Sequence, residues 1–171
     1  MIFPEEDSRE RADAYRVLAD LFSRPPRQDL LIKVRADLEL DSQESEYEIS
    51  SDFNDLFLIP QGRVLPLESV FVGSDPVGTR YALMQFYTQA GLTIDEEFRF
   101  IPDHLSLEFL FMSYLIGTGN TPLQEDFLDE HILRWVPAFC EEAAQYAQTG
   151  FYREIADLTS AFVLKEYQGF E

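Results

Sequence analysis

The spacing of apolar residues along the chain predicts α-helices almost throughout. Near the N-terminus one apolar stripe, ended by two prolines at 25–26, consists of Ala14, Tyr15, Leu18, Leu21 and Phe22. A shorter helix is predicted from Asp29, a favourable N-cap residue, to about Leu40. The segment 42–57 has a weaker pattern, whose inner face would hold Tyr47, Phe53, Leu56 and Phe57. The first third of the chain is therefore predicted to be helical.

Residues 58–76 interrupt this pattern, with three prolines and two glycines. No single regular element fits such a composition, so we expect a long ordered loop, and loops of this length are often functional. Asp75 followed by Pro76 indicates the start of the next helix, because a proline in the first turn has no N–H that needs a partner. Gly91 is a typical residue for the end of that helix.

A central helix is predicted over residues 103–116, preceded by Pro102 and ended by the sequence GTGN. Between residues 105 and 116 the only charged residue is Glu108, so this helix is expected to be buried. Asp103 is expected to cap its first turn, where an acid is stabilised by the helix dipole.

In the C-terminal part a helix is predicted over 123–133. Pro137 either kinks this helix or starts a new one. The next stripe, ended by Gly150, consists of Val136, Phe139, Cys140, Ala143 and Ala147, and the last helix carries Phe151, Ile155, Leu158 and Phe162. No alternating run indicates strands, and no internal repeat is visible. The sequence thus predicts one all-α globular domain spanning residues 1–171.

Composition limits the class of protein further. Apolar residues make up 46% and aromatic residues 14% of the chain, which excludes a disordered protein. Cys140 is the single cysteine and excludes internal disulfides and multi-cysteine metal sites. No stretch has the apolar length of a membrane span, and the charged N-terminal sequence MIFPEEDSRERADAY lacks the apolar core of a secretory signal. We therefore expect a cytoplasmic protein that does not insert into membranes.

The net charge of −19, from 32 acids and 13 bases, excludes nucleic acid as a favourable partner. The same charge would speed the approach of a cationic partner. Acidic surfaces also serve solubility alone or occur in salt-adapted cells, so charge by itself leaves both interpretations open.

Asp103 and His104 are the candidate chemistry at the entrance of the central helix. As a structural pair, Asp103 caps the helix and His104 meets Glu108, four residues on along the same face. As a metal site, His104 and Glu108 supply two ligands where zinc takes three or four, and His131 is the only other imidazole, so no metal is expected. Glu68 would join this pair for acid-base chemistry only if the loop meets the helix. A small helical enzyme or metal-binding protein using Glu68, His104 and Glu108 remains the alternative, although no nucleophile or phosphate-binding motif is present.

A binding groove is the third possibility for the same region. A loop rich in leucine, valine, phenylalanine and proline, close to carboxylates, suits a peptide that is both apolar and basic. Arginine is the natural partner, because its planar fork binds a carboxylate through two hydrogen bonds. We expect Leu65, Leu67 and Phe71, with neighbours on the central helix, to line the groove.

Four segments, in order, resemble the redox-enzyme maturation chaperones of the TorD/DmsD/NarJ type: RADAYRVLADLFSRPP, FNDLFLIPQGRVLPLESVF, IPDHLSLEFLFMSYL and FLDEHILRWVPAFCEEAAQYAQTGFYREIADLTSAFV. They are similar to the family's Y-x-x-L-A-x-L-F opening helix, its P-x-E-S-V-Y segment (here with Phe71 in place of tyrosine), its P-D-H motif and its closing H-L-x-x-W-x-P-x-F and F-Y-x-x-L-A-x-L-T pieces. Two features depart from the pattern: Trp135 is the sole tryptophan, whereas some relatives have a tryptophan-rich pocket, and the loop between helices is short.

The resemblance implies an all-helical chaperone without catalytic turnover and without a cofactor of its own. Such chaperones bind the apoprotein of a molybdopterin-dependent oxidoreductase, in many cases through its twin-arginine signal peptide, until the cofactor is inserted. By analogy the peptide-binding residues are Asp103 and His104 in the central motif, Glu68 and Ser69 in the loop, and Glu108 beside them. A homodimer, with exchange of the last helix between protomers, remains open.

Overall fold

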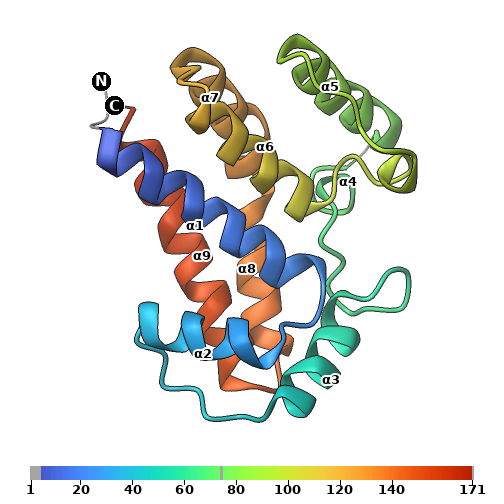
Figure 1. Cartoon of the computed structure of the whole chain (residues 1–171). Helices are drawn as coiled ribbons and strands as arrows, with labels where there is room; N and C mark the ends of the chain where they lie inside the picture. The colour runs from blue at the N-terminus through green and yellow to red at the C-terminus, as the bar shows by residue number, and fades with distance from the viewer. Residues whose placement is uncertain (1–4, 74, 171) are drawn as a thin grey trace.

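The computed structural model describes residues 5–73 and 75–170, which form helices joined by short connections (Figure 1). The elements are α1 (Glu5–Ser23), α2 (Gln28–Asp37), α3 (Glu46–Phe57), α4 (Glu68–Phe71), α5 (Pro76–Gln89), the 3₁₀ turn η1 (Glu96–Phe98), α6 (Leu105–Gly117), α7 (Thr121–Phe127), the π-helical turn η2 (Leu128–Ile132), α8 (Leu133–Tyr146) and α9 (Gly150–Gln168). In the described residues the only extended pairing is an isolated antiparallel bridge between Leu67 and His104. The predicted all-α class is confirmed.

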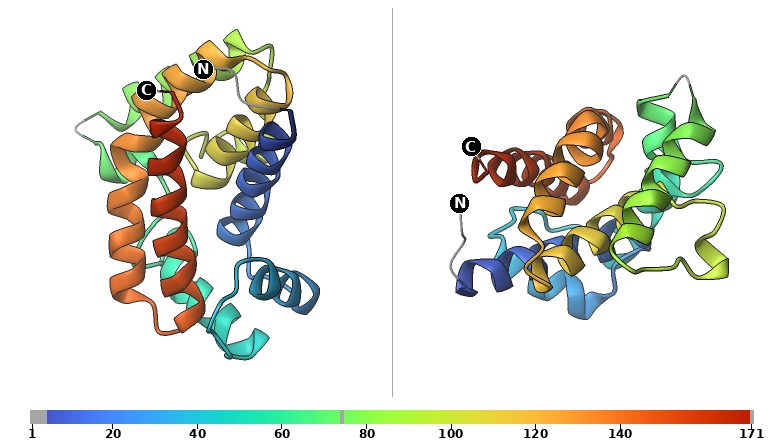
Figure 2. Two further views of the ribbon diagram at one scale, coloured as in Figure 1. Left: turned by 90° about the vertical axis from the view of Figure 1, so that its left-hand side faces the viewer. Right: turned by 90° about the horizontal axis from the view of Figure 1, so that it is seen from above.

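The long helices pack around a shared apolar core, with α2 and α3 at one end of the molecule and α5 and α7 at the other (Figures 1 and 2). Helix α1 lies along the central helix α6, and α8 lies beside α9. Tyr15 of α1 meets the edge of Phe109 on α6 at 5.5 Å and of Phe162 on α9 at 4.8 Å between ring centroids. Each fully buried aromatic side chain contributes on the order of 2 kcal/mol through burial. These ring contacts hold α6 in place between α1 and α9, and the candidate site lies at the N-terminal end of α6.

The N-terminal predictions are confirmed in outline and corrected in two details. Helix α1 buries Tyr15, Leu18, Leu21 and Phe22 of the predicted stripe, whereas Ala14 is half-buried, and the helix ends before the prolines. Helix α2 begins at Gln28, with Arg27 and not Asp29 at the N-cap, because the Leu31 amide bonds to the Arg27 carbonyl at 2.9 Å. Tyr47, expected on the inner face of α3, is 82% exposed, and Ile49 fills the buried position.

In the described part of the segment, residues 58–73 and 75–76, the predicted loop contains the one-turn helix α4. Asp75 caps α5 as expected, accepting a hydrogen bond from the Gly78 amide at 2.9 Å. Gly91 follows the end of α5 with φ of 79°, a left-handed conformation that glycine adopts without strain. The boundaries of α5 were thus readable from the sequence.

The central helix begins two residues later than predicted. Its N-cap is His104, whose Nδ1 accepts a hydrogen bond from the Ser106 amide at 3.2 Å. The expectation that Asp103 caps α6 is wrong, because the Asp103 carboxylate bonds across to another segment. The GTGN sequence ends α6, and Asn120 caps α7, accepting from the Leu123 amide at 3.3 Å.

Pro137 lies inside α8. Its ring has no N–H for the carbonyl of Leu133 and crowds that carbonyl, and the preceding turn, η2, is π-helical. Two other expectations are corrected: α8 ends at Tyr146, so Gly150 instead opens α9, and Leu158 is 39% exposed rather than part of the inner stripe. Within the described ranges, no helix has the length and apolar character needed to cross a membrane.

Candidate functional site

The loop that carries α4 is held against the start of α6 by main-chain hydrogen bonds. The Glu68 amide donates to the Asp103 carbonyl at 3.0 Å, and the Leu105 amide donates to the Pro66 carbonyl at 2.9 Å. These bonds flank the bridge between Leu67 and His104. Two motifs separated by more than thirty residues in the sequence are therefore adjacent in space, as the groove hypothesis requires.

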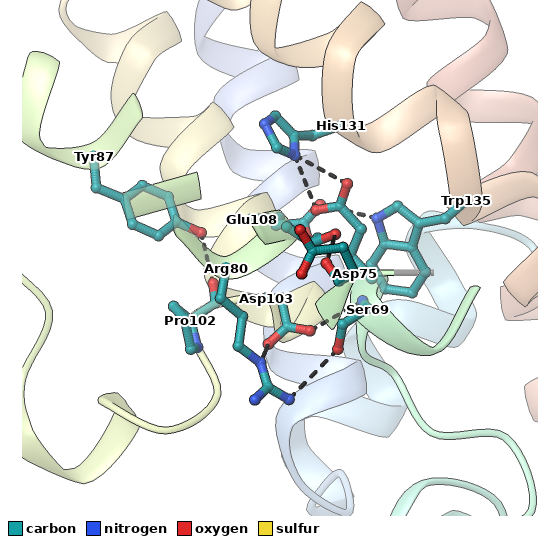
Figure 3. Close-up of polar contacts among 11 residues, drawn as sticks. Ser69, Asp75, Arg80, Tyr87, Pro102, Asp103, Glu108, His131 and Trp135 are labelled. Atoms are coloured by element: carbon teal, nitrogen blue, oxygen red, sulfur yellow. Dashed lines mark hydrogen bonds and ion pairs between the residues drawn. The ribbon is translucent and has the colours of Figure 1, made fainter. Parts of the chain in front are cut away.

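The Asp103 carboxylate caps α4. Its Oδ2 accepts from the Ser69 amide at 3.0 Å, and its Oδ1 accepts from Arg80 Nε on α5 at 3.0 Å (Figure 3). The N-cap residue of α4 is Leu67, which has no polar side chain, so Asp103 supplies the missing acceptor from a distant segment. Asp103 is fully buried, whereas the Arg80 side chain is 38% exposed. The pair thus joins α4, α5 and the segment before α6.

Glu68 and His131 form a second buried contact. Nδ1 of His131 lies 3.0 and 2.9 Å from the two oxygens of the Glu68 carboxylate, and the two side chains are only 5% and 2% exposed. The His131 ring stacks on Phe127 at 5.2 Å and meets Phe86 of α5 edge-on at 5.1 Å. In such a contact the ring N–H donates to the carboxylate, so the Glu68–His131 pair ties α4 to η2 inside the protein.

Glu108 lies in the same cluster and is fully buried. Trp135 Nε1 donates to its Oε2 at 3.1 Å (Figure 3). Burial raises the pKa of Glu108 well above its usual range, the negative charge of Glu68 raises it further, and the hydrogen bond from Trp135 opposes this shift. Its other oxygen, Oε1, has no hydrogen-bond partner. Glu108 is therefore a buried carboxyl group whose surroundings favour its neutral form.

Replacing Glu108 with glutamine is expected to stabilise the protein on the order of 1 kcal/mol near neutral pH. The folded-state pKa of Glu108 is raised, so the stability it contributes is present below the ordinary value of 4.5 and is lost as pH rises. Glutamine does not titrate, and its amide can donate to Glu68 while accepting from Trp135. The advantage of E108Q in urea unfolding midpoint should therefore grow from pH 5 to pH 8; a difference between the two proteins that stays the same at every pH would show that the pKa of Glu108 is not raised.

The surroundings of His104 favour its uncharged form. Burial lowers its pKa to about 4, against a smaller raising effect of the Asp103 charge. Its Nδ1 also lies 2.7 Å from the Ser106 hydroxyl. At neutral pH His104 is an uncharged helix cap.

The sequence matches the family described as the nitrate reductase delta subunit over residues 5–141. The chain belongs to this family. It is 27% identical over 140 residues to the chaperone protein TorD of Vibrio cholerae, covering 74% of this chain and 64% of the relative. It is 30% identical over 138 residues to TorD of Photobacterium profundum, covering 70% and 62%. The aligned part is thus less than two thirds of the length of these relatives.

A solved structure, titled a putative redox enzyme maturation protein from Archaeoglobus fulgidus, superimposes with a TM-score of 0.59 over 89% of this chain and 91% of the other. The sequence identity is 20%, so this similarity establishes the fold. The relatives are named as chaperones and a maturation protein, and none of these names is that of a catalyst. The predicted membership in the TorD/NarJ group of chaperones is confirmed.

The site residues inferred from the family motifs all lie around the junction of α4 and α6, but few of them face outward. Asp103, expected to face a client, has no exposed surface, and Leu67 is 6% exposed. Phe71 is half-buried, its ring 5.7 Å from that of Trp135 and 5.8 Å from that of Phe139. Leu65 is likewise half-buried. The motif residues therefore lie mostly inside the junction between α4 and α6 and hold it together.

Sequence reasoning missed three partners in this cluster: Arg80, His131 and Trp135. The sequence held a signal for two of them, because His131 and Trp135 are four residues apart and such a spacing places side chains on one face of a helix. In the structure both side chains point toward the carboxylates (Figure 3). The acid-base alternative paired Glu68 with His104, whereas the structure places His131 beside Glu68. Over residues 5–73 and 75–170 no three His, Cys, Asp or Glu side chains are arranged to hold a metal ion.

Proposed function

We propose that this protein is a cytoplasmic chaperone for a molybdopterin-dependent oxidoreductase. It binds the apoprotein of the catalytic subunit through its twin-arginine signal peptide and holds it until cofactor insertion is complete. It carries out no reaction and uses no cofactor of its own. The match to the family over residues 5–141, together with relatives named as chaperones, carries this proposal.

The geometry supports two roles for the residues of the motifs. Glu68, Ser69, Asp103 and Glu108 are buried and act by positioning. Asp103 joins α4 to α5, Glu68 joins α4 to η2, and Glu108 joins α6 to α8. Less buried neighbours are available for contacts with other parts of the client. Beside the half-buried Leu65 and Phe71, two valines present open apolar surface: Val70 is 55% exposed and Val72 is 39% exposed. His104, 9% exposed, lies at the edge between the two groups.

The charge of the chain supports a basic partner. A net charge of −19 on 171 residues produces an attractive field for the arginines of a signal peptide. This attraction acts mainly on encounter, while the apolar contacts set how long the complex lasts.

The association rate constant of a twin-arginine peptide is expected to fall at least tenfold between low and high salt, because steering by exposed charges is screened within about a Debye length. Stopped-flow fluorescence anisotropy with a labelled peptide, two adjacent arginines followed by a leucine- and alanine-rich segment, measures this rate. The control peptide carries glutamines in place of both arginines and should associate slowly at every salt concentration. A salt-independent rate for the arginine peptide would remove the electrostatic part of the proposal, and no binding by either peptide would refute the signal-peptide function.

A further inference from the structure

Helix α6 is apolar on every side, but one side is left uncovered. Its single charged residue, Glu108, is buried. A helix of this composition is normally covered all round. Leu110 and Tyr114, on successive turns of α6, are nevertheless 44% and 39% exposed. The central helix of the fold thus presents an apolar face to solvent.

A hollow of about 280 Å³ adjoins this face, between α6, the end of α5 and residues 92–98. Apolar side chains form most of its wall, among them Tyr87, Leu92, Ile94, Phe98, Leu107 and Leu110. The Tyr87 hydroxyl donates to the Pro102 carbonyl at 2.9 Å, so the wall is attached to the segment that leads into the buried cluster. Small-molecule sites usually measure about 300–1,000 Å³. The hollow is just below that range and suits one or two side chains of a peptide better than a cofactor.

The rim of the hollow is acidic. Asp95 lines it, and Glu96 and Glu97 follow as exposed residues. The opposing base in this segment is Arg99, so residues 91–101 carry a net charge of −2 from three acids and one base. The single charged residue of α5, Arg80, bonds to Asp103. An apolar floor beside an acidic rim is complementary to a segment in which apolar side chains follow basic ones.

We infer that this hollow receives the apolar segment of the client's signal peptide, with the preceding arginines at the acidic rim. The inference rests on the proposed function and locates the binding site for that apolar segment. It differs from the groove predicted at Leu65, Leu67 and Phe71, none of which lines the hollow. The buried cluster then affects peptide binding indirectly, because it holds α5 and the start of α6 in the positions that form the walls of the hollow.

Replacing Leu110 with glutamine tests the inference, because glutamine keeps the helical propensity and approximate size while removing the apolar contact. The affinity for the arginine–leucine peptide is expected to fall about tenfold. The matched control is L164Q on α9, at a leucine with a similar exposure of 47%. That variant should bind the peptide as the native chain does, and urea unfolding of both variants checks that neither has lost its fold.

The outcomes separate the inference from the proposed function. Native-like binding by L110Q, with tight binding by the native chain, overturns the hollow as the site and leaves the chaperone function intact. No binding by the native chain overturns both. Sedimentation of the unliganded proteins tests the other occupant: a native dimer that becomes monomeric in L110Q would assign the hollow to a second copy of this chain and overturn the inference.

Discussion

Replacement of Glu68 by alanine is expected to lower the free energy of unfolding by about 3–5 kcal/mol, because it leaves His131 buried without its partner. Glu68 is 2% exposed and His131 is 4% exposed, so water cannot readily replace the lost contact. The loss also opens a cavity beneath α4. Urea unfolding followed by the fluorescence of Trp135, the sole tryptophan, measures the effect and reports on the adjacent hydrogen bond to Glu108.

A glutamine at position 68 provides the matched control. It keeps an acceptor for His131 and fills the same volume, so E68Q should lose about 1 kcal/mol. The double variant E68A/H131A should lose much less than the sum of the two single changes, because each single change already breaks the contact. Additive losses, or an unchanged unfolding midpoint for E68A, would mean that the contact between Glu68 and His131 contributes nothing to the fold.

Asp103→Ala is expected to cost about 2–3 kcal/mol of stability, less than the loss of Glu68, because its partner Arg80 is partly exposed and can turn to solvent. The Ser69 amide has no such alternative, so α4 loses its cap and moves relative to α5, to which Asp103 no longer joins it. Peptide affinity should fall as a consequence of that movement. The measurements are the unfolding midpoint and the dissociation constant of the peptide on the same preparations.

Two variants distinguish positioning from direct contact. D103N retains an oxygen that can accept from the Ser69 amide, and it should recover part of both stability and affinity. D95A removes the same charge from an exposed residue and should leave stability within about 0.5 kcal/mol of the native value. If D103A unfolded at the native urea concentration but bound peptide far more weakly, Asp103 would contact the client directly, contrary to its burial.

The local sequence determined the helix boundaries that depend only on residues within one turn. Asp75 with Pro76 marked the start of α5 and Gly91 its end, and the GTGN sequence marked the end of α6. The motif resemblance was equally readable, since it lies in residue types in a fixed order. It placed Glu68 and Asp103 in the same predicted site.

The tertiary structure decided which partner each polar side chain took. Asp103 has the sequence context of a cap for α6, but it caps α4, because folding brings the Ser69 amide and Arg80 within 3.0 Å of its carboxylate. Glu68 pairs with His131 because α8 and the preceding π-helical turn bring that imidazole over α4, 63 residues further along the chain. The exposed face of α6 and its hollow likewise arise from where residues 92–98 lie against α5. Periodicity predicts which side of a helix is apolar. Contacts between distant segments depend on how the helices pack, so only the tertiary structure shows them.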